Sequence, residues 1–335
     1  MKPKLAISMG DPAGIGPEII VASLDEMKDI CIPTIFGHWA SLEAICRLMK
    51  RPVDDFVVTD SYSGPFAENL IQFVNVTTGI SSPATPITSP GDDSAHAQLN
   101  ALAEAVTAIE RNHCDALVTA PVSKEVVARI APGFTGHTEY LAERSHLAKD
   151  DVTMVFATPR LVVGLISTHV PLARIPETIN EKRYSRTLRH VIETVKQNTG
   201  KTAPRIAVAG LNPHAGEGGL LGKEEIEFIE PFCKRNNGLN GVQILGPIPA
   251  DAVYRDAFAG KYDGVIAAYH DQALIPLKLS GFGGATNVTA GLPFIRTSPD
   301  HGTAYEIARK QIADASAMKT AIQMAVRLQK GKVSP

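Results

Sequence analysis

Residues 267–307 read AAYHDQALIPLKLSGFGGATNVTAGLPFIRTSPDHGTAYEI. They continue an apolar run, residues 264–268, that ends in three polar residues at 269–271. This pattern predicts a buried strand that presents polar side chains at its carboxyl end, where open α/β sheets bind their ligands. Charged residues rarely lie inside apolar strands without a partner, so Lys278 and Arg296 in the later apolar runs indicate an anionic ligand.

The same stretch is rich in glycine and apolar residues, at 281–284 and 290–294. Glycine allows a backbone to approach a ligand closely. Large exposed apolar patches usually mark interfaces, so this segment also predicts a surface that a second subunit covers. The polar turn at 300–303 predicts the start of a helix.

The remainder of the chain alternates short apolar strands with amphipathic helices, which predicts a doubly wound α/β fold. Its 335 residues exceed the size at which a single core keeps growing, so two domains are expected. Hydrophobic content of 44% and charged content of 20% are those of an ordinary globular protein. The formal net charge of −2 argues against the strongly basic surface that nucleic-acid binders carry.

The four cysteines form no CxxC pair, and each lies in or beside an apolar segment. They are Cys31, Cys46, Cys114 and Cys233. This usage predicts reduced, packed thiols of a cytosolic protein. Residues 1–4 lead directly into a strand, and no apolar run approaches membrane-spanning length. We therefore expect a cytoplasmic protein without a secretory leader.

A glycine-bearing loop, residues 9–18, follows the first apolar strand. Gly14 and Gly16 permit a tight strand-to-helix turn, and Pro17 suits the first turn of a helix. Such a loop can hold an anion through its backbone N–H groups. The spacing is not G-x-G-x-x-G, so a Rossmann site is disfavoured, and a plain strand-to-helix turn remains the alternative.

A second polar loop, residues 133–139, opens another predicted helix. His137 and Thr138 can aim donors at an anion there, together with the helix N-terminus. The alternative is a helix cap with a surface histidine. Lys124 follows a buried strand, residues 116–119, and is placed to meet a ligand, although a solvated lysine is the commoner case.

His169, His214 and His270 each stand just after a separate apolar strand. Parallel strands present their carboxyl ends at one edge of a sheet, so these histidines can converge. Three histidines with an open coordination position suit a catalytic divalent cation, zinc most easily, that polarises a substrate oxygen. A single strand-end histidine is usually structural, but three in equivalent positions favour a metal site.

Taken together, these motifs resemble the 4-hydroxythreonine-4-phosphate dehydrogenase family of vitamin B6 biosynthesis, including its D-threonate and D-erythronate 4-phosphate dehydrogenase paralogues. The resemblance spans nearly the whole chain. The segments that carry it are GDPAGIGPE (10–18), FTGHTE (134–139), STHVPL (167–172), LNPHAGEGG (211–219), YHDQALIPLK (269–278) and NVTAGLPFIRTSPDHGTA (287–304).

The resemblance implies an isocitrate/isopropylmalate-dehydrogenase-like fold with two α/β/α domains and an interdomain cleft. The first domain is expected to be discontinuous, residues 1–125 plus 245–335, and the second to cover residues 126–244. The family also implies a homodimer whose active sites are shared between subunits.

The family's residues carry over onto positions of this chain. The implied metal ligands are His169, His214 and His270, with one contributed across the dimer. The implied substrate-binding residues are His137, Thr138, Lys278, Asn287 and Arg296. A likeness to the wider fold family places the adenosine of the nicotinamide cofactor near His301, Gly302, Thr303 and Ala304.

The implied reaction uses NAD or NADP and one divalent metal per site, zinc, magnesium or cobalt. It oxidises 4-phosphohydroxy-L-threonine at C3, and the product decarboxylates to 3-amino-2-oxopropyl phosphate. Oxidation of D-threonate or D-erythronate 4-phosphate is the alternative within the family. Lys278, Arg296 and His137 would hold the phosphate. The proton acceptor stays open between Lys124 and Asp271.

Two other classes of function remain as alternatives. A metal-dependent hydrolase of phosphate esters would also use histidines and cations, although the chain lacks a tight Asp/His pattern for two metals. A phosphosugar-binding regulatory protein would close two domains on its ligand and would need no redox cofactor.

Overall fold

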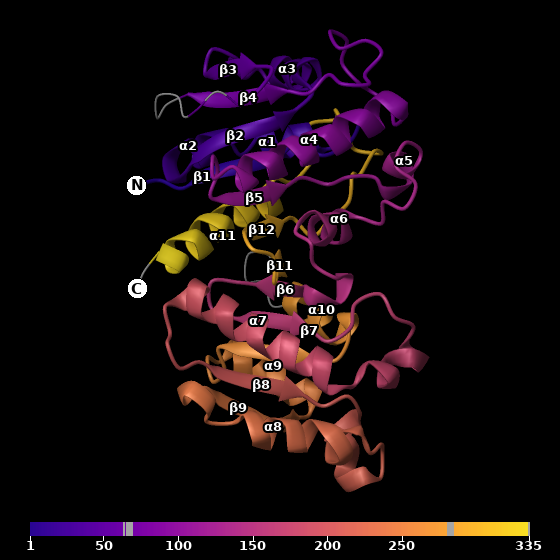
Figure 1. Ribbon diagram of the computed structural model, residues 1–335, viewed down its shortest axis with the longest axis vertical. Helices are drawn as coiled ribbons and strands as arrows, with labels where there is room; N and C mark the ends of the chain where they lie inside the picture. Colours follow the sequence, from indigo (N-terminus) through magenta and orange to yellow (C-terminus); the bar gives the residue numbers. More distant parts are fainter. Residues whose placement is uncertain (63, 65–69, 280–284, 334–335) are drawn as a thin grey trace. The chain divides into compact units, whose positions relative to one another are not determined.

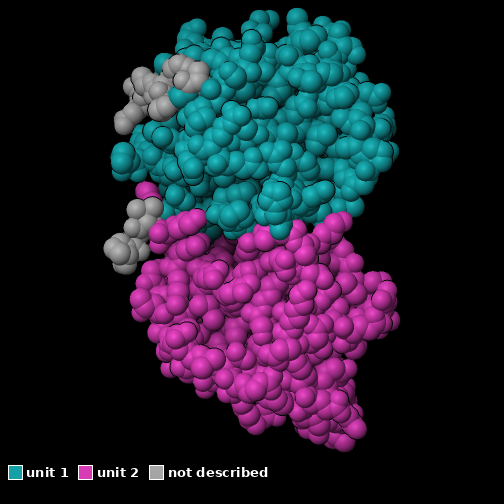
Figure 2. All heavy atoms as spheres, in the orientation of Figure 1, with its two compact units in different colours: residues 1–146, 292–329 teal, residues 147–291, 330–335 magenta. Residues whose placement is uncertain are grey.

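The computed structural model describes residues 1–62, 64, 70–279 and 285–333 (Figure 1). The glycine-rich segment 281–284, on which two of the predictions above depend, lies outside these described residues. The chain forms two compact units, which are coloured separately in Figure 2. Unit 1 comprises residues 1–146 and 292–329, and unit 2 comprises residues 147–291 and 330–335.

Unit 1 is built on a parallel sheet. Its strands, in spatial order, are β3 (Phe56–Thr59), β4 (Ile71–Asn75), β2 (Ile32–Gly37), β1 (Lys4–Ser8), β5 (Ala116–Thr119) and β12 (Ile295–Ser298). Each neighbouring pair among them is parallel. The central strands β1 and β5 are buried almost throughout, as expected of parallel strands that are covered on both faces.

Helices flank this sheet. They are α1 (Gly16–Val21), α2 (Leu24–Ile30), α3 (Trp39–Leu48), α4 (Asp92–Glu110), α5 (Lys124–Ala128), α6 (His137–Arg144) and α11 (Ser316–Val333). Helix α4 packs on β1, β2 and β5, and it places Leu102 and Val106 in one apolar core with Phe36 and Leu117. Apolar residues at helical spacing therefore bury one face of α4, as the sequence predicted.

Unit 2 has a mixed sheet. Its strands, in spatial order, are β11 (Thr286–Ala290), β6 (Thr153–Ala157), β7 (Val162–Leu165), β10 (Gly264–Ala267), β8 (Arg205–Ala209) and β9 (Gln243–Ile248). Strand β6 runs antiparallel to β11 and β7, and the other pairs are parallel.

The helices of unit 2 are α7 (Glu181–Thr199), α8 (Glu230–Asn236), α9 (Ala250–Phe258) and α10 (His270–Leu279). Shorter helical turns are η1 (Lys149–Asp151), η2 (Leu172–Thr178), η3 (Pro213–Gly219), η4 (Glu225–Ile229) and η5 (Leu239–Gly241). Across the described residues, no helix is both long and apolar enough to cross a membrane.

Helix α7 begins and ends at well-defined caps. The side chain of Asn180 accepts a hydrogen bond from the backbone N–H of Arg183, and Gly200 closes the helix with a φ of 72°. The helix then packs on β7 and β10. A Cβ at Gly164 or Gly264 in those strands would overlap the side chain of Val191. Glycine at both positions thus lets the helix approach the sheet closely.

The predicted domain boundaries differ from the boundaries of these two units. Like the prediction, the structure has a discontinuous first part, but residues 245–291 belong to unit 2. The reason is that β10 hydrogen-bonds to both β7 and β8, so it cannot leave their sheet. Residues 126–146 belong to unit 1, because Leu141 and Phe134 pack in the same core as α4. The α/β class itself is confirmed.

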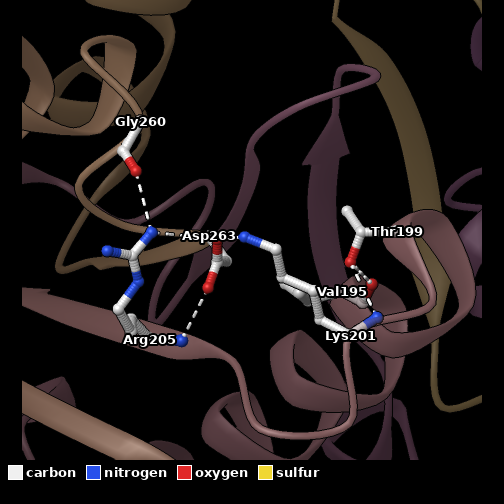
Figure 3. A network of polar contacts seen from close by, with 6 residues as sticks. All are labelled: Val195, Thr199, Lys201, Arg205, Gly260 and Asp263. Carbon is white, nitrogen blue, oxygen red and sulfur yellow. Dashed lines mark hydrogen bonds and ion pairs between the residues drawn. The ribbon is translucent and has the colours of Figure 1, made fainter.

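A buried carboxylate holds the amino ends of β8 and β10 together (Figure 3). Asp263 accepts hydrogen bonds from Lys201 Nζ at 2.5 Å and from the backbone N–H of Arg205 at 2.8 Å. The side chain of Asp263 is 7% exposed, whereas that of Lys201 is 50% exposed. Burial alone raises the pKa of Asp263, but these hydrogen bonds outweigh it, so the pKa lies below the ordinary value.

We predict that Asp263→Asn lowers the free energy of unfolding by about 1–2 kcal/mol at pH 7, because the variant loses charge-assisted hydrogen bonds. The loss stays this small because solvent screens the ion pairs with Lys201 and Arg205. A carboxyl whose folded pKa is depressed stabilises the fold above its unfolded pKa of about 3.9 and loses this contribution as the pH falls through the folded pKa. The difference between variant and parent should therefore shrink below about pH 4.

Urea denaturation followed from pH 7 to about pH 3.5 measures this difference. Asp256→Asn is the matched control, because Asp256 also pairs with a lysine and an arginine but at the surface. A stability difference for Asp263→Asn that does not change with pH would contradict the assignment.

Candidate active site

The three strand-end histidines follow neighbouring strands of unit 2. β10 pairs in parallel with β7 on one side and β8 on the other. His169 comes after β7, His270 opens α10 directly after β10, and His214 lies in the turn η3 after β8. The expected arrangement of three histidine-bearing strand ends at one sheet edge is present.

Two side chains tie these strand ends to one another. Gln272 accepts a hydrogen bond from the backbone N–H of Ala268 at 2.7 Å and donates one to the carbonyl of Gly210 at 2.8 Å. Ser167 Oγ donates to the carbonyl of Ala268 at 2.8 Å. Gln272 and Ser167 are both buried, so these bonds satisfy backbone groups that water does not reach.

His169 and His270 lie near each other, with ring centroids 6.1 Å apart. Nδ1 of His270 lies 2.7 Å from Oδ1 of Asp271, which leaves Nε2 as the nitrogen without that partner. Carboxylates commonly orient metal-binding histidines in this way. Two neighbouring imidazoles supply nitrogen ligands of the kind that zinc binds.

His214 does not complete a set of three within one chain. Within the described ranges, no group of three or more His, Cys, Asp or Glu side chains is close enough to hold a metal ion. His214 is exposed and has a left-handed backbone conformation, with φ of 51°. The residues of one chain therefore offer a pair of imidazoles and a separate third one.

Two further predicted residues of unit 2 are Lys278 and Asn287. Lys278 lies in the last turn of α10 and is exposed. Asn287 lies in β11, and its Oδ1 is buried without a hydrogen-bond partner among the residues that the structure describes. A buried, unsatisfied amide oxygen is uncommon in proteins and indicates a place for a ligand donor or a water.

Arg296 forms the centre of a cationic cluster in unit 1. It is 3% exposed, lies in β12, and donates from Nε at 3.2 Å and Nη2 at 2.7 Å to Oγ1 of Thr119 at the end of β5. Burial lowers the pKa of Arg296 to about 10, and nearby Glu139 acts in the opposite direction. Arg296 therefore stays charged at neutral pH.

His137 opens α6 beside this arginine, and Thr138 follows it in the first turn. The ring nitrogen Nε2 of His137 is inaccessible and has no hydrogen-bond partner within the described part of the chain. Burial first, and then the charges of Arg296 and Lys124, hold the pKa of His137 well below its usual range. The imidazole is thus neutral at physiological pH and can donate a hydrogen bond without carrying charge.

Lys124 belongs to the same neighbourhood, because its Nζ would lie 3.4 Å from a Cβ built on Gly136, the residue before α6. Lys124, His137 and Arg296 therefore combine two cations with a neutral donor. This combination can bind an anion such as a phosphate.

The segment proposed for adenosine lies against the first glycine loop. The carbonyl of Thr303 accepts a hydrogen bond from the N–H of Ile15 at 3.0 Å, and a Cβ on Gly14 would meet that carbonyl oxygen at 2.7 Å. Nε2 of His301 is buried and lacks a partner in the described chain. Gly302 has open space around it, and Ala304 has a φ of 45°.

The helix predicted to start at residues 300–303 is absent from this described segment. Residues 305–311 form turns, and the next helix, α11, begins at Ser316. Arg309 has a φ of 64°, and its guanidinium donates to the carbonyls of Ala13 and Ile87. These long-range bonds hold the segment in an irregular conformation that its sequence does not indicate.

Asp11 joins the two segments and was not singled out from the sequence. Its carboxylate is fully buried and accepts hydrogen bonds from Ser94 Oγ at 2.6 Å, Gln98 Nε2 at 2.9 Å, Tyr305 OH at 2.5 Å and the N–H of Ala13 at 2.8 Å. The sequence feature that could have identified Asp11 is its position: it follows the first strand, lies near the start of the glycine loop and precedes Pro12.

Comparison with known proteins gives consistent matches. A family model described as the pyridoxal phosphate biosynthetic protein PdxA matches residues 29–325. The 4-hydroxythreonine-4-phosphate dehydrogenase of Desulforapulum autotrophicum is 36% identical over 326 residues, which cover 97% of this chain and 95% of that protein. The D-threonate 4-phosphate dehydrogenase of Pectobacterium atrosepticum is 38% identical, covering 97% of this chain and 98% of that protein.

Among solved structures, the crystal structure of 4-hydroxythreonine-4-phosphate dehydrogenase from Klebsiella pneumoniae matches with a TM-score of 0.85 at 36% identity. The match covers 98% of this chain and 100% of the Klebsiella chain. The similarity therefore extends over both units.

We predict that Asp11→Asn lowers the free energy of unfolding by about 3 kcal/mol, because an amide sets a donor against the donors that surround this buried carboxylate. Asp92→Asn is the control, because Asp92 lies in the first turn of α4 and is itself exposed; it should cost no more than about 0.5 kcal/mol. Urea denaturation at neutral pH measures both. Equal losses in the two variants would contradict the role of Asp11 as the central acceptor.

Proposed function

The chain belongs to the family of the pyridoxal phosphate biosynthetic protein PdxA, and on that basis we propose that it oxidises 4-phosphohydroxy-L-threonine at C3 with NAD or NADP. The predicted isocitrate/isopropylmalate-dehydrogenase-like fold is confirmed by the likeness to solved members. The observation that carries the proposal is the similarity to 4-hydroxythreonine-4-phosphate dehydrogenases along the whole chain. We place the enzyme in the cytoplasm.

In this reaction the carbon atom C3 loses a hydride to the nicotinamide cofactor, and the hydroxyl on C3 loses its proton to a base, so that a ketone forms. The product, 2-amino-3-oxo-4-phosphooxybutanoate, is a β-keto acid and loses CO₂ to give 3-amino-2-oxopropyl phosphate. The chain must therefore hold a phosphate, orient the hydroxyl and accept a proton.

We assign the phosphate to the cationic cluster around Arg296. A buried guanidinium offers a planar set of donors that matches phosphate oxygens. Nε2 of His137 adds a neutral donor, and Thr138 lies in the same first turn of α6. By family resemblance, Lys278 and Asn287 belong to the same substrate-binding set.

We assign one divalent metal to His169, His214 and His270. Imidazole ligands suit zinc or cobalt better than magnesium, which prefers oxygen ligands. When bound, such an ion stabilises negative charge that develops on substrate oxygens. Asp271 orients the ring of His270. Because one chain gathers only two of these histidines, the proposal takes the third from the partner in a homodimer.

We assign the adenosine of the cofactor to His301, Gly302, Thr303 and Ala304. The partnerless Nε2 of His301 and the open space at Gly302 support this placement. Lys124 and Asp271 both stay candidates for the proton acceptor: a lysine accepts a proton only as the neutral amine, and the carboxylate of Asp271 also contacts His270.

D-threonate 4-phosphate is the second candidate substrate, because the Pectobacterium relative named for it is as similar to this chain as the 4-hydroxythreonine-4-phosphate dehydrogenases are. The two substrates differ in having an amino or a hydroxyl group at C2. Both retain the phosphate, so the assignments above serve either one.

Steady-state kinetics with both substrates tests the proposal. We expect NAD or NADP reduction with a higher kcat/KM for 4-phosphohydroxy-L-threonine, because the Desulforapulum and Klebsiella relatives are both named for it. The opposite preference would establish the second candidate. No reduction of either cofactor with either substrate would overturn the dehydrogenase assignment.

We further predict that Arg296→Lys raises KM for the phosphorylated substrate about 10- to 100-fold with a smaller change in kcat, because the charge stays but the planar donors are lost. Arg144→Lys is the matched control, since Arg144 makes a similar paired contact with Glu110 at the surface. An unchanged KM in Arg296→Lys removes Arg296 from the substrate set.

A further inference from the structure

The turn that carries His214 has an unusual backbone. Five consecutive residues, 214–218, are left-handed, with φ values of 51°, 50°, 81°, 43° and 63°. His214, Ala215 and Glu217 among them are not glycine. Side chains disfavour this conformation, and such strain persists only where the surroundings enforce it, most often at functional sites.

A buried carboxylate provides that enforcement. Glu225, the first residue of η4, is 1% exposed. Its Oε1 accepts the backbone N–H of Asn212 at 2.7 Å, and its Oε2 accepts Nδ2 of the same residue at 2.9 Å. The carbonyl of Asn212 in turn accepts the N–H of Ala215 at 3.1 Å. Glu225 therefore fixes Asn212, and Asn212 fixes the start of the turn.

Three glycines make room for this pair. A Cβ on Gly216 would lie 2.7 Å from Oε2 of Glu225, and one on Gly210 would lie 3.3 Å from Oε1. A Cβ on Gly222 would collide with Nδ2 of Asn212. The left-handed turn is thus wrapped around the contact between Asn212 and Glu225.

We propose that Glu225, acting through Asn212, is a positioning residue that holds His214 in the geometry required to bind the metal. This inference rests on the proposed function, because it assumes that His214 is a metal ligand. Glu225 itself touches neither substrate nor metal in this scheme.

Glu225→Gln tests the idea with a minimal change of shape. Both carboxylate oxygens of Glu225 accept hydrogen bonds from Asn212. In Glu225→Gln the side-chain NH₂ group replaces one of these oxygens, so it faces either the backbone N–H or the Nδ2 group of Asn212, which are both donors. Asn212 cannot turn its amide over to relieve this, because Nδ2 also donates to Oε2 of Glu224 at 2.7 Å. Outer residues that orient metal ligands typically contribute 10- to 100-fold in affinity, and we expect a loss of about that size.

The affinity of the full-length protein for Zn²⁺ and Co²⁺ is measured by equilibrium dialysis, and circular dichroism without metal checks the fold. Glu227→Gln is the matched control, because Glu227 lies on the same helical turn and is exposed. It should bind both metals as the parent does.

Gly222→Ala provides a second route to the same lesion, since the added methyl group displaces Asn212 and leaves Glu225 and His214 unchanged. It should show a similar loss of metal affinity. Thus the proposal does not depend on one variant that fails to fold.

His214→Ala separates this inference from the proposed function. If His214→Ala binds metal as tightly as the parent, the proposed metal site is wrong. If His214→Ala weakens binding while Glu225→Gln and Gly222→Ala keep parental affinity, the positioning role of Glu225 alone is overturned.

Discussion

The edge of the unit 2 sheet that is followed by His214 and His270 depends on two hydrogen bonds of the Gln272 side chain. This side chain bonds the N–H of Ala268 and the carbonyl of Gly210, the backbone groups at which β10 and β8 leave their sheet. Strand ends that lose their neighbours expose polar groups, and buried ones must find partners. By supplying both partners, Gln272 gives the helix that begins at His270 and the turn that carries His214 a common starting point.

The sequence predicted this edge well because its signals are local. Apolar runs punctuated by polar residues located β7, β8 and β10, and a histidine followed each one. The second domain was predicted to end at residue 244, whereas unit 2 continues to residue 291. The difference arises because β10 pairs with β7 and β8, which lie far away in the sequence.

The sequence also did not predict which polar groups are buried. Glu225 resembles any acid on a helix, and only the folded chain shows both its oxygens directed at Asn212. Similarly, the sequence identified Arg296 and His137 as residues that bind an anion. Burial lowers the pKa of both side chains, and only the structure shows which of them stays charged at neutral pH. Arg296 keeps its charge and His137 loses it. Their charges therefore differ, although the sequence suggested only that both bind an anion.

The two ends of the strands in unit 2 are chemically distinct. Asp263, Lys201 and Arg205 lie at the amino ends of β10 and β8, whereas the histidines follow the carboxyl ends. A surface charge at the amino ends, such as that of half-exposed Lys201, can therefore be exchanged without altering any residue that follows the carboxyl ends.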